Sequence, residues 1–375
     1  MSQLKAVQAA TTALNELGID QSEPVDPFEA IEDAGLLLRF QPLKDLLGAV
    51  LPGDPGGVLI NSARPASLQR YTAAHELGHW YMDQDVLSLD TDEAVFGHPH
   101  GEARELDAQV FAAHFLMPLE LLYTVARRYG IRRGQAADAE QVYQAARDMH
   151  VSYEATVRQL MNTRLISPSN GNQLLKTQPA AIKQRLTGGL RLPNARGDVW
   201  IVEHPEDQAE VEAFVGDAIL LRLTEYPATG YRWYAEETLT EATIHPFRPA
   251  PPPFNGGQAF TDAAPAPGGG EVVPFPAMAE ASDVVSLLQD RLVQEPYQAG
   301  ATAVGGAVTR LVAYTADAPG DEAIQLNHVR PVRPNAPVSR IRVTTHVRGV
   351  PEVEFRRRLI AAFARGEAEG TEWDY

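Results

Sequence analysis

The sequence predicts an α+β protein of more than one domain, and three observations support this prediction. Its 375 residues exceed the usual domain size of about 100 to 200 residues. Apolar residues recur at helical spacing up to about residue 166, so the first part is expected to be mostly helical with a short sheet. After residue 197, short runs rich in β-branched residues indicate a β-domain. The polar, Gly-containing segment at residues 167–196 is typical of a linker.

Composition limits the kinds of site and partner that the chain can have. The chain has no cysteine, which excludes disulfides and thiolate ligands, so any metal must be held by histidines and carboxylates. The formal net charge of −17 disfavours sequence-independent binding to nucleic acid or to an anionic membrane. No stretch approaches the roughly 18 apolar residues of a membrane span, and the first residues lack a long apolar segment. We therefore expect a cytoplasmic protein without membrane contact.

The first predicted strand, residues 57–61, precedes a helix that carries the motif HELGH at residues 75–79. On a helix, positions i and i+4 project from the same face, so His75 and His79 can bind one zinc ion. Glu76 lies beside that face, and a carboxylate next to a zinc-bound water can accept its proton and later pass it to a leaving amine. The motif alone leaves open a simpler alternative, in which a helix carries two histidines and an unrelated glutamate.

A second helix, residues 105–118, is expected to supply the third metal ligand. Its apolar residues form an i, i+3, i+4, i+7 stripe: Ala108, Phe111, Ala112 and Phe115. Glu105 continues this stripe one turn earlier, and a carboxylate on the buried side needs a partner. Asp107 is a competing candidate, and either residue can instead be a solvated carboxylate of the first turn. His98 and His100 lie in a loop with Gly and Pro, which fixes ligand geometry less well than a helix does.

Residues 140–149 and 153–165 are typical of a helix-turn-helix, with Ser152 as the N-cap of the second helix. That second helix offers few side chains to a DNA groove: Arg158, Asn162 and Arg164. Because the whole chain is strongly acidic, we expect these helices to pack against the first part of the protein and not to bind duplex DNA.

The second part contains four expected strands, at residues 218–224, 308–314, 323–329 and 340–347. The last of them alternates apolar and polar residues, as a half-buried strand requires. Residues 249–276 contain 8 Pro and 5 Gly, a composition that buries too little apolar surface to offset the entropy cost of ordering, so a mobile loop is predicted. Helical periodicity predicts further helices at residues 282–292 and 352–365.

Three blocks of the first part carry a resemblance to a known family: PVDPF at residues 24–28, GGVLINSARPASLQRYTAAHELGH at residues 56–79, and ELDAQVFAAHFLMP at residues 105–118. With these blocks, most of residues 20–165 resembles the ImmA/IrrE family of zinc-dependent regulatory metallopeptidases. The chain departs from the family pattern at residues 107–109, where Asp-Ala-Gln stands in place of the frequent Glu-Ala-Asn or Glu-Ala-Asp.

The resemblance implies a zincin-like metallopeptidase domain that binds zinc through His75, His79 and Glu105, with Glu76 as the catalytic residue. It also implies a protein substrate, such as a helix-turn-helix transcriptional repressor that is cleaved in a stress, DNA-damage or mobile-element response. In metallopeptidases an edge strand can pair with an extended substrate. The strand at residues 57–61 is either such an edge strand or an internal strand of the core.

In the second part, residues 215–233 resemble the first half of chagasin-like inhibitors of papain-type cysteine proteases. The residues that match the three loops of that family are Pro227, Thr229, Gly230, Tyr231 and Trp233, then Val304-Gly305-Gly306, then Arg330-Pro331. The chain departs from the pattern at Tyr226, Ala228 and Val332. The resemblance implies an immunoglobulin-like β-sandwich over residues 197–348. Tyr231 and Trp233 either contact a protein ligand or fill the core of the sandwich.

We interpret the chain as a metallopeptidase domain at residues 1–166, a linker at residues 167–196, a chagasin-like domain at residues 197–348, and a C-terminal helix with an acidic tail at residues 349–375. The sequence thus predicts a zinc metalloendopeptidase that acts on a specific protein, with the β-domain governing recognition or control. Two alternatives stay open. One is a sensor or DNA-binding regulator that has kept the peptidase fold without proteolysis, and the other is a protease inhibitor that acts through the chagasin-like domain.

Overall fold

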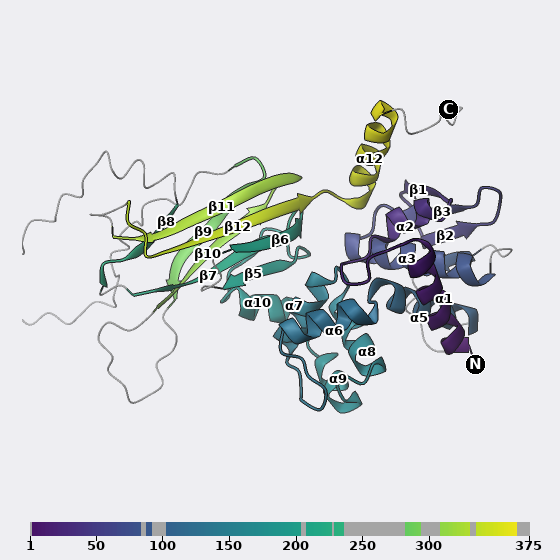
Figure 1. Cartoon of the computed structure of the whole chain (residues 1–375), viewed down its shortest axis with the longest axis horizontal. Helices are drawn as coiled ribbons and strands as arrows, with labels where there is room; N and C mark the ends of the chain where they lie inside the picture. The colour runs from purple at the N-terminus through teal and green to yellow at the C-terminus, as the bar shows by residue number, and fades with distance from the viewer. Residues whose placement is uncertain are drawn as a thin grey trace, which may run out of the picture. The chain divides into compact units, whose positions relative to one another are not determined.

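The computed structural model describes residues 2–83, 88–91, 103–203, 208–226, 229–235, 282–293, 308–330 and 335–365. It confirms a mixed α+β protein (Figure 1). The chain forms two compact units: residues 1–191 with 349–375 make up unit 1, and residues 192–348 make up unit 2. The Pro- and Gly-rich segment at residues 249–276, for which a mobile loop is predicted, lies outside the described residues.

Unit 1 contains a four-stranded sheet in the order β1-β3-β2-β4. Its strands are β1 (Leu37–Gln41), β2 (Leu46–Leu51), β3 (Gly57–Asn61) and β4 (Ser88–Thr91). β3 covers the predicted residues, and it pairs in parallel with β1 and antiparallel with β2. The hypothesis that this strand is an open edge is therefore wrong, because β1 and β2 occupy both of its sides and make it an internal strand.

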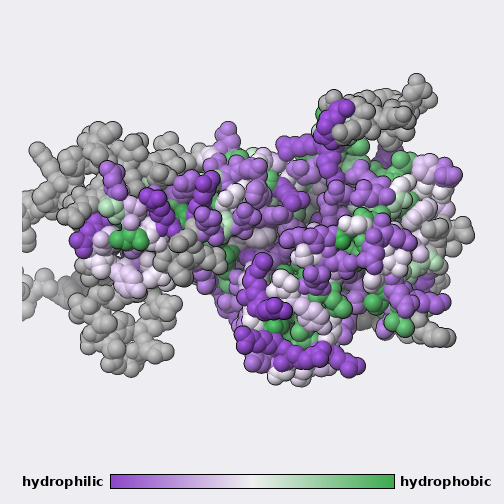
Figure 2. Space-filling model, in the orientation of Figure 1, coloured by the Kyte–Doolittle hydropathy of each residue, from purple (hydrophilic) through white to green (hydrophobic). Residues whose placement is uncertain are grey.

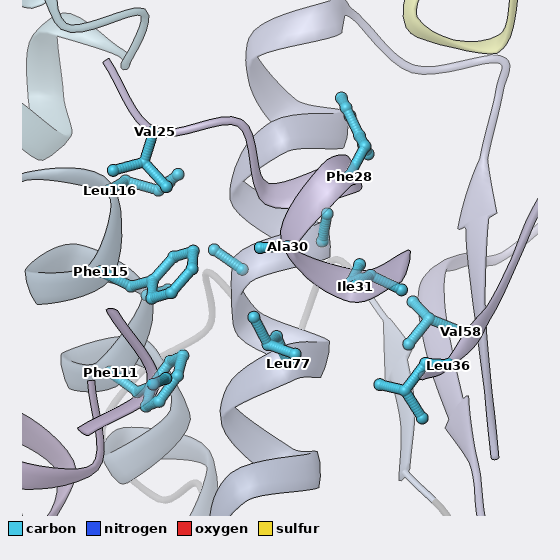
Figure 3. Close-up of a cluster of buried hydrophobic side chains, with 14 of the residues drawn as sticks. Val25, Phe28, Ala30, Ile31, Leu36, Val58, Leu77, Phe111, Phe115 and Leu116 are labelled. Carbon is cyan, nitrogen blue, oxygen red and sulfur yellow. The ribbon is translucent and has the colours of Figure 1, made fainter. Parts of the chain in front are cut away.

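Four helices contribute to the hydrophobic core of unit 1: α1 (Ser2–Glu16), α2 (Pro27–Asp33), α3 (Ala66–Asp83) and α5 (Ala103–Leu116). Figure 3 shows Leu77 of α3 between Phe111 and Phe115 of α5 on one side and Ile31 of α2 on the other. All four side chains are fully buried. The predicted apolar stripe of residues 105–118 is thus confirmed as the buried face of α5. Packing from two sides fixes α3, the helix that carries the HELGH motif.

The start of α2 shows why the PVDPF block has its sequence. Asp26 precedes the helix in an extended conformation, and its carboxylate accepts a hydrogen bond of 2.9 Å from the Phe28 amide. Pro27 occupies the first turn, where the missing N–H costs no hydrogen bond. The block is therefore a helix cap that sets where α2 begins.

A helical segment follows α5, with α6 (Leu119–Arg128), α7 (Ala139–Asp148), α8 (Tyr153–Asn162), α9 (Pro168–Leu174) and α10 (Pro179–Leu186). α7 and α8 confirm the two helices of the predicted helix-turn-helix, and Ser152 caps α8 by accepting a hydrogen bond of 3.1 Å from the Ala155 amide. The Gln159 amide nitrogen of α8 lies 3.4 Å from Nδ1 of His114, so α8 contacts α5 of unit 1. Helix α9 was not predicted, because its polar, Gly-containing sequence is typical of a linker.

Within the described residues, no helix by itself has both the length and the apolar character needed to cross a membrane. α5 and α6, which are bent relative to each other by 58°, meet that test only when taken together. Figure 2 shows a surface on which hydrophobic residues lie singly or in small groups among hydrophilic ones.

α12 (Pro351–Arg365) confirms the helix predicted near the C-terminal end, and it belongs to unit 1 although it follows unit 2 in the chain. The Phe355 ring packs on Phe40 of β1, with ring centroids 5.6 Å apart. Arg358 forms an ion pair of 3.1 Å with Glu32 of α2. α12 thus covers a part of the core to which α2 and β1 contribute.

Unit 2 contains two four-stranded sheets, in the orders β5-β7-β10-β9 and β6-β12-β11-β8. Their strands are β5 (Val199–Glu203), β6 (Gln208–Phe214), β7 (Ala218–Glu225), β8 (Arg232–Ala235), β9 (Val285–Val293), β10 (Val308–Ala316), β11 (Gly320–Val329) and β12 (Ser339–Arg348). One hydrophobic core contains side chains of both sheets: Trp200, Leu221, Val312, Trp233 and Val343. The four predicted strands are confirmed as β7, β10, β11 and β12.

The prediction of a helix at residues 282–292 is wrong, because Val285–Val293 form strand β9. This strand pairs antiparallel with β10 from Val285 to Val293. A short apolar run does not by itself distinguish a helix from a strand. β10 pairs with β7 on one side, and the N–H and C=O groups on its other side need hydrogen-bond partners. A strand at residues 285–293 supplies these partners, and a helix would not.

Of the two aromatic residues Tyr231 and Trp233, one is buried and the other is partly exposed. Trp233 is fully buried and its ring stacks on His328 with centroids 4.7 Å apart, so this side chain fills the core. The partly exposed Tyr231 ring lies under the Arg330 guanidinium, 4.7 Å from it. Several residues singled out in the loops lie outside the described part of the chain: Pro227, Ala228, Val304, Gly305, Gly306, Pro331 and Val332.

A buried carboxylate joins three strands of unit 2. Asp217 accepts hydrogen bonds from the Asp198 amide at 2.7 Å, the Trp200 indole at 2.9 Å and the Phe214 amide at 3.0 Å. Burial, with a smaller contribution from the Asp198 charge, raises the pKa of Asp217 to about 6 from an ordinary value of 3.8. The fold therefore favours the protonated carboxyl in the range between these two values.

Unit 2 is expected to lose stability as the pH rises from about 4 to about 6. The raised pKa means that the folded state binds more protons than the unfolded state in this range, so stabilisation present below pH ~4 is lost above pH ~6. A pKa of about 6 in place of 3.8 corresponds to about 3 kcal/mol of unfolding free energy. Urea denaturation at both pH values measures the change. Asp217→Asn cannot titrate, and equal pH dependence in the two proteins would contradict the prediction.

Candidate metal centre

α3 places the three polar residues of the HELGH motif in the interior of unit 1. His75, Glu76 and His79 are all fully buried. The Nε2 atoms of the two histidines lie 3.2 Å apart, and the rings meet edge to face at 82°. Two imidazole nitrogens one helical turn apart thus converge on one position, as the spacing predicts.

The first turn of α5 brings Glu105 to the same position. Its Oε2 atom lies 3.3 Å from Nε2 of His75, and its Oε1 atom lies 3.5 Å from Nε2 of His79. Hydrogen bonds with His75 and then with His79 hold the pKa of the Glu105 carboxyl well below its usual range. Each residue offers one ligand atom, and the three atoms lie within 4.8 Å of one another, so the group can hold a metal ion.

The competing candidates for the third ligand stand apart from this group. Asp107 is on α5 as well, but its Oδ1 atom is buried without a hydrogen-bond partner among the described residues, and it does not belong to the His75–His79–Glu105 group. His98 and His100 lie outside the described residues. The structure therefore brings together the three residues that the family resemblance implies.

A glycine inside the motif allows α5 to approach α3 closely. A Cβ atom at Gly78 would lie 2.9 Å from Cδ1 and 3.1 Å from Cβ of Phe111. Phe111 is fully buried and stacks on both Tyr81 and Phe115, so it has little room to move away. The motif pattern marks only the His and Glu positions. The requirement for glycine at residue 78 follows from the contact with Phe111 of α5, which the motif itself does not include.

The first part of the chain is similar to known metalloproteases. Residues 31–161 match the Peptidase M78 family, which is described as the IrrE N-terminal-like domain. Over 98 residues the chain is 38% identical to the radiation response metalloprotease IrrE of Deinococcus radiodurans and 36% identical to that of Deinococcus deserti. The match covers 26% of this chain and 29% and 34% of those proteins, so it spans about a third of their length.

Solved structures of a different kind are also similar to the chain. The cysteine protease inhibitor EhICP2 of Entamoeba histolytica shows 20% identity and a TM-score of 0.27, with 41% of this chain and 98% of that chain covered. The ICP of Leishmania mexicana shows 16% identity and a TM-score of 0.21, with 42% of this chain and 96% of that chain covered.

Proposed function

We propose that this chain, whose residues 31–161 match the IrrE N-terminal-like domain, is a zinc-dependent regulatory endopeptidase whose first unit is zincin-like. The observation that carries the proposal is the convergence of His75, His79 and Glu105. The Nε2 atoms of His75 and His79 lie 3.2 Å apart, Oε2 of Glu105 lies 3.3 Å from Nε2 of His75, and the other Glu105 oxygen, Oε1, lies 3.5 Å from Nε2 of His79. A tetrahedral zinc ion with bonds of about 2.0 to 2.1 Å requires ligand atoms about 3.3 Å apart, so the three residues fit this metal.

Two roles in peptide hydrolysis are proposed for residues of this chain: three residues bind the metal, and Glu76 transfers protons. His75, His79 and Glu105 would hold the zinc ion, as three protein ligands do in catalytic zinc sites. Bound zinc polarises a peptide carbonyl and makes a water molecule acidic near neutral pH. Glu76 follows His75 in the helix, and its carboxylate accepts a proton and delivers it to the leaving amine. His75, Glu76 and His79 are fully buried, and charge interactions between buried groups are stronger than in bulk water.

We propose that the substrate is a specific protein, with a helix-turn-helix repressor that controls a stress, DNA-damage or mobile-element response as the first candidate. Both relatives are radiation response metalloproteases, and this similarity supports a regulatory role. Unit 2 is proposed to be an immunoglobulin-like, chagasin-like module that governs which protein is cut or when. The described ligand group lies wholly in unit 1, which supports a role for unit 2 outside the chemistry.

Two measurements on the full chain test the proposed activity. Elemental analysis is expected to find about one zinc per molecule, and co-incubation with a repressor encoded beside the gene is expected to give discrete fragments. Absence of metal after gentle purification and after zinc titration would refute the zinc site. A zinc-loaded protein that cleaves no candidate would favour the alternative of a sensor without proteolysis. Inhibition of papain by the chain would instead favour the inhibitor alternative.

Gly78→Ala is expected to weaken zinc binding by about tenfold to 100-fold. The added Cβ would push α5 away from α3 at Phe111, and the shift would move Glu105 relative to the two histidines. Competition with a chromophoric zinc chelator measures the affinity. Gly57→Ala is the matched control, because its Cβ would lie 3.5 Å from the Leu37 carbonyl, an ordinary contact. A folded Gly78→Ala protein with wild-type zinc affinity would contradict this role of the glycine.

A further inference from the structure

Gly48 of β2 faces the motif helix at a point where no side chain fits. A Cβ atom built there would lie 2.5 Å from Cγ2 of Thr72 and 2.8 Å from Oε1 of Glu76. It would also lie 3.0 Å from the carbonyl oxygen of Leu59 on the neighbouring strand. Real Cβ atoms essentially never approach other heavy atoms this closely, so any residue other than glycine requires Thr72 or Glu76 to move. The backbone of Gly48 does not have positive φ, so close packing alone requires the glycine.

β2 is irregular at this glycine. Its pairing with β4 shifts register between Leu46 and Gly48, whereas its pairing with β3 joins Gly48 to Ile60 without a shift. Irregularities such as β-bulges redirect a strand locally and occur often next to active sites. Leu47, the residue within the shift, is 1% exposed and therefore has its side chain in the interior. At Gly48 the strand therefore has only backbone atoms, and no side chain, facing the Glu76 carboxylate, which is proposed to transfer protons.

We propose that Gly48 is a positioning residue for Glu76, an inference that rests on the proposed peptidase function. The carboxylate of Glu76 lies between α3, which carries it, and the backbone of β2, which limits it on the side of Gly48. Thr72, one helical turn earlier on α3, is 1% exposed and contacts the same place on the strand. Together these contacts restrict where the Glu76 oxygens can lie beside the His75–His79–Glu105 group.

Gly48 affects the placement of the Glu76 carboxylate and not the binding of the metal. The three atoms closest to the added Cβ belong to Thr72, Glu76 and Leu59, and none belongs to a proposed zinc ligand. A methyl group at residue 48 would therefore displace the proton-transferring carboxylate and leave the ligand atoms in place. A misplacement of about 1 Å in a reacting group can lower the rate by about 100-fold.

Gly48→Ala in the full chain is expected to lower kcat for cleavage of the repressor by about 100-fold, with KM and zinc content unchanged. Gly57→Ala places the same methyl group on the adjacent strand β3, where the nearest atom is 3.5 Å away, and is expected to behave like the wild type. Wild-type kcat in a folded, zinc-loaded Gly48→Ala protein would overturn the proposal. Equal losses in the two variants would also overturn it, because the effect would then be general to the sheet.

The double variant Gly48→Ala with Thr72→Ser separates positioning from general packing. Serine lacks Cγ2, so the substitution removes the 2.5 Å contact and keeps the contact with Glu76. We expect the melting temperature to return toward the wild-type value while kcat stays low. Recovery of kcat along with stability would overturn the positioning role. A zinc-loaded wild type without peptidase activity would overturn the proposed function and this role together, an outcome distinct from an active Gly48→Ala variant.

Discussion

Glu76→Gln is expected to keep about one zinc per molecule and to lower the cleavage rate by about 1000-fold, because glutamine can neither accept nor deliver the proton. Glu76 is not among the three residues whose ligand atoms converge, so its replacement leaves the donor set complete. Glutamine has nearly the shape of glutamate, and the close contact with Gly48 therefore remains possible. Elemental analysis and a cleavage assay on the same preparation measure the two quantities together.

The Glu76→Gln variant is informative because it is expected to keep its zinc and to lose its activity. A comparison with His79→Ala is informative, since that substitution removes a converging nitrogen and is expected to lose zinc and activity together. Loss of zinc in the Glu76→Gln protein would mean that Glu76 is a ligand. Retention of activity would mean that another group moves the proton, and the proposed mechanism would need a different base.

Glu105→Ala is expected to weaken zinc binding by more than about 100-fold, whereas Asp107→Ala is expected to change it little. Loss of hydrogen-bonding partners behind metal ligands typically costs 10- to 100-fold in affinity, and loss of a ligand costs more. The Glu105 oxygens lie 3.3 and 3.5 Å from the two histidine nitrogens, whereas Asp107 is outside this group. Zinc titration of both variants against a competing chelator gives the ranking.

The two substitutions control for each other because both remove a carboxylate from the first half of α5. A general effect of helix stability or net charge would weaken zinc binding similarly in both proteins. The opposite ranking would transfer the third ligand to Asp107 and would require α5 to turn relative to α3. It would also contradict the burial of Phe111 and Phe115, which fixes the face that α5 turns to the core.

The candidate metal centre could be predicted largely from sequence because its residues follow the spacing of a helix. His75 and His79 are one turn apart, and Glu105 extends the apolar stripe that α5 buries. The residues that surround Glu76 could not be predicted in this way. Gly48 comes from β2, a strand that was not predicted from the sequence, and the need for glycine arises from a contact between segments 28 residues apart. Local patterns carry no information about such contacts.

The sheets show a similar division. Strands β7, β10, β11 and β12 have enough consecutive β-branched and apolar residues to be predicted, whereas β9 has a pattern that also suits a helix. Pairing with β10 decides its conformation. The same holds for β3, whose residues were predicted but whose place in the sheet was not, because its neighbours β1 and β2 determine whether it is an edge.

The position of α12 in the chain affects the order in which unit 1 can fold during synthesis. The ribosome makes α2 and β1 early, and it makes Phe355 and Arg358 only after all of unit 2. Until then, the Phe40 ring and the Glu32 carboxylate lack the partners that α12 gives them. Unit 1 therefore reaches its full packing late in translation, and a premature stop within unit 2 would release a chain whose first core is exposed at this place.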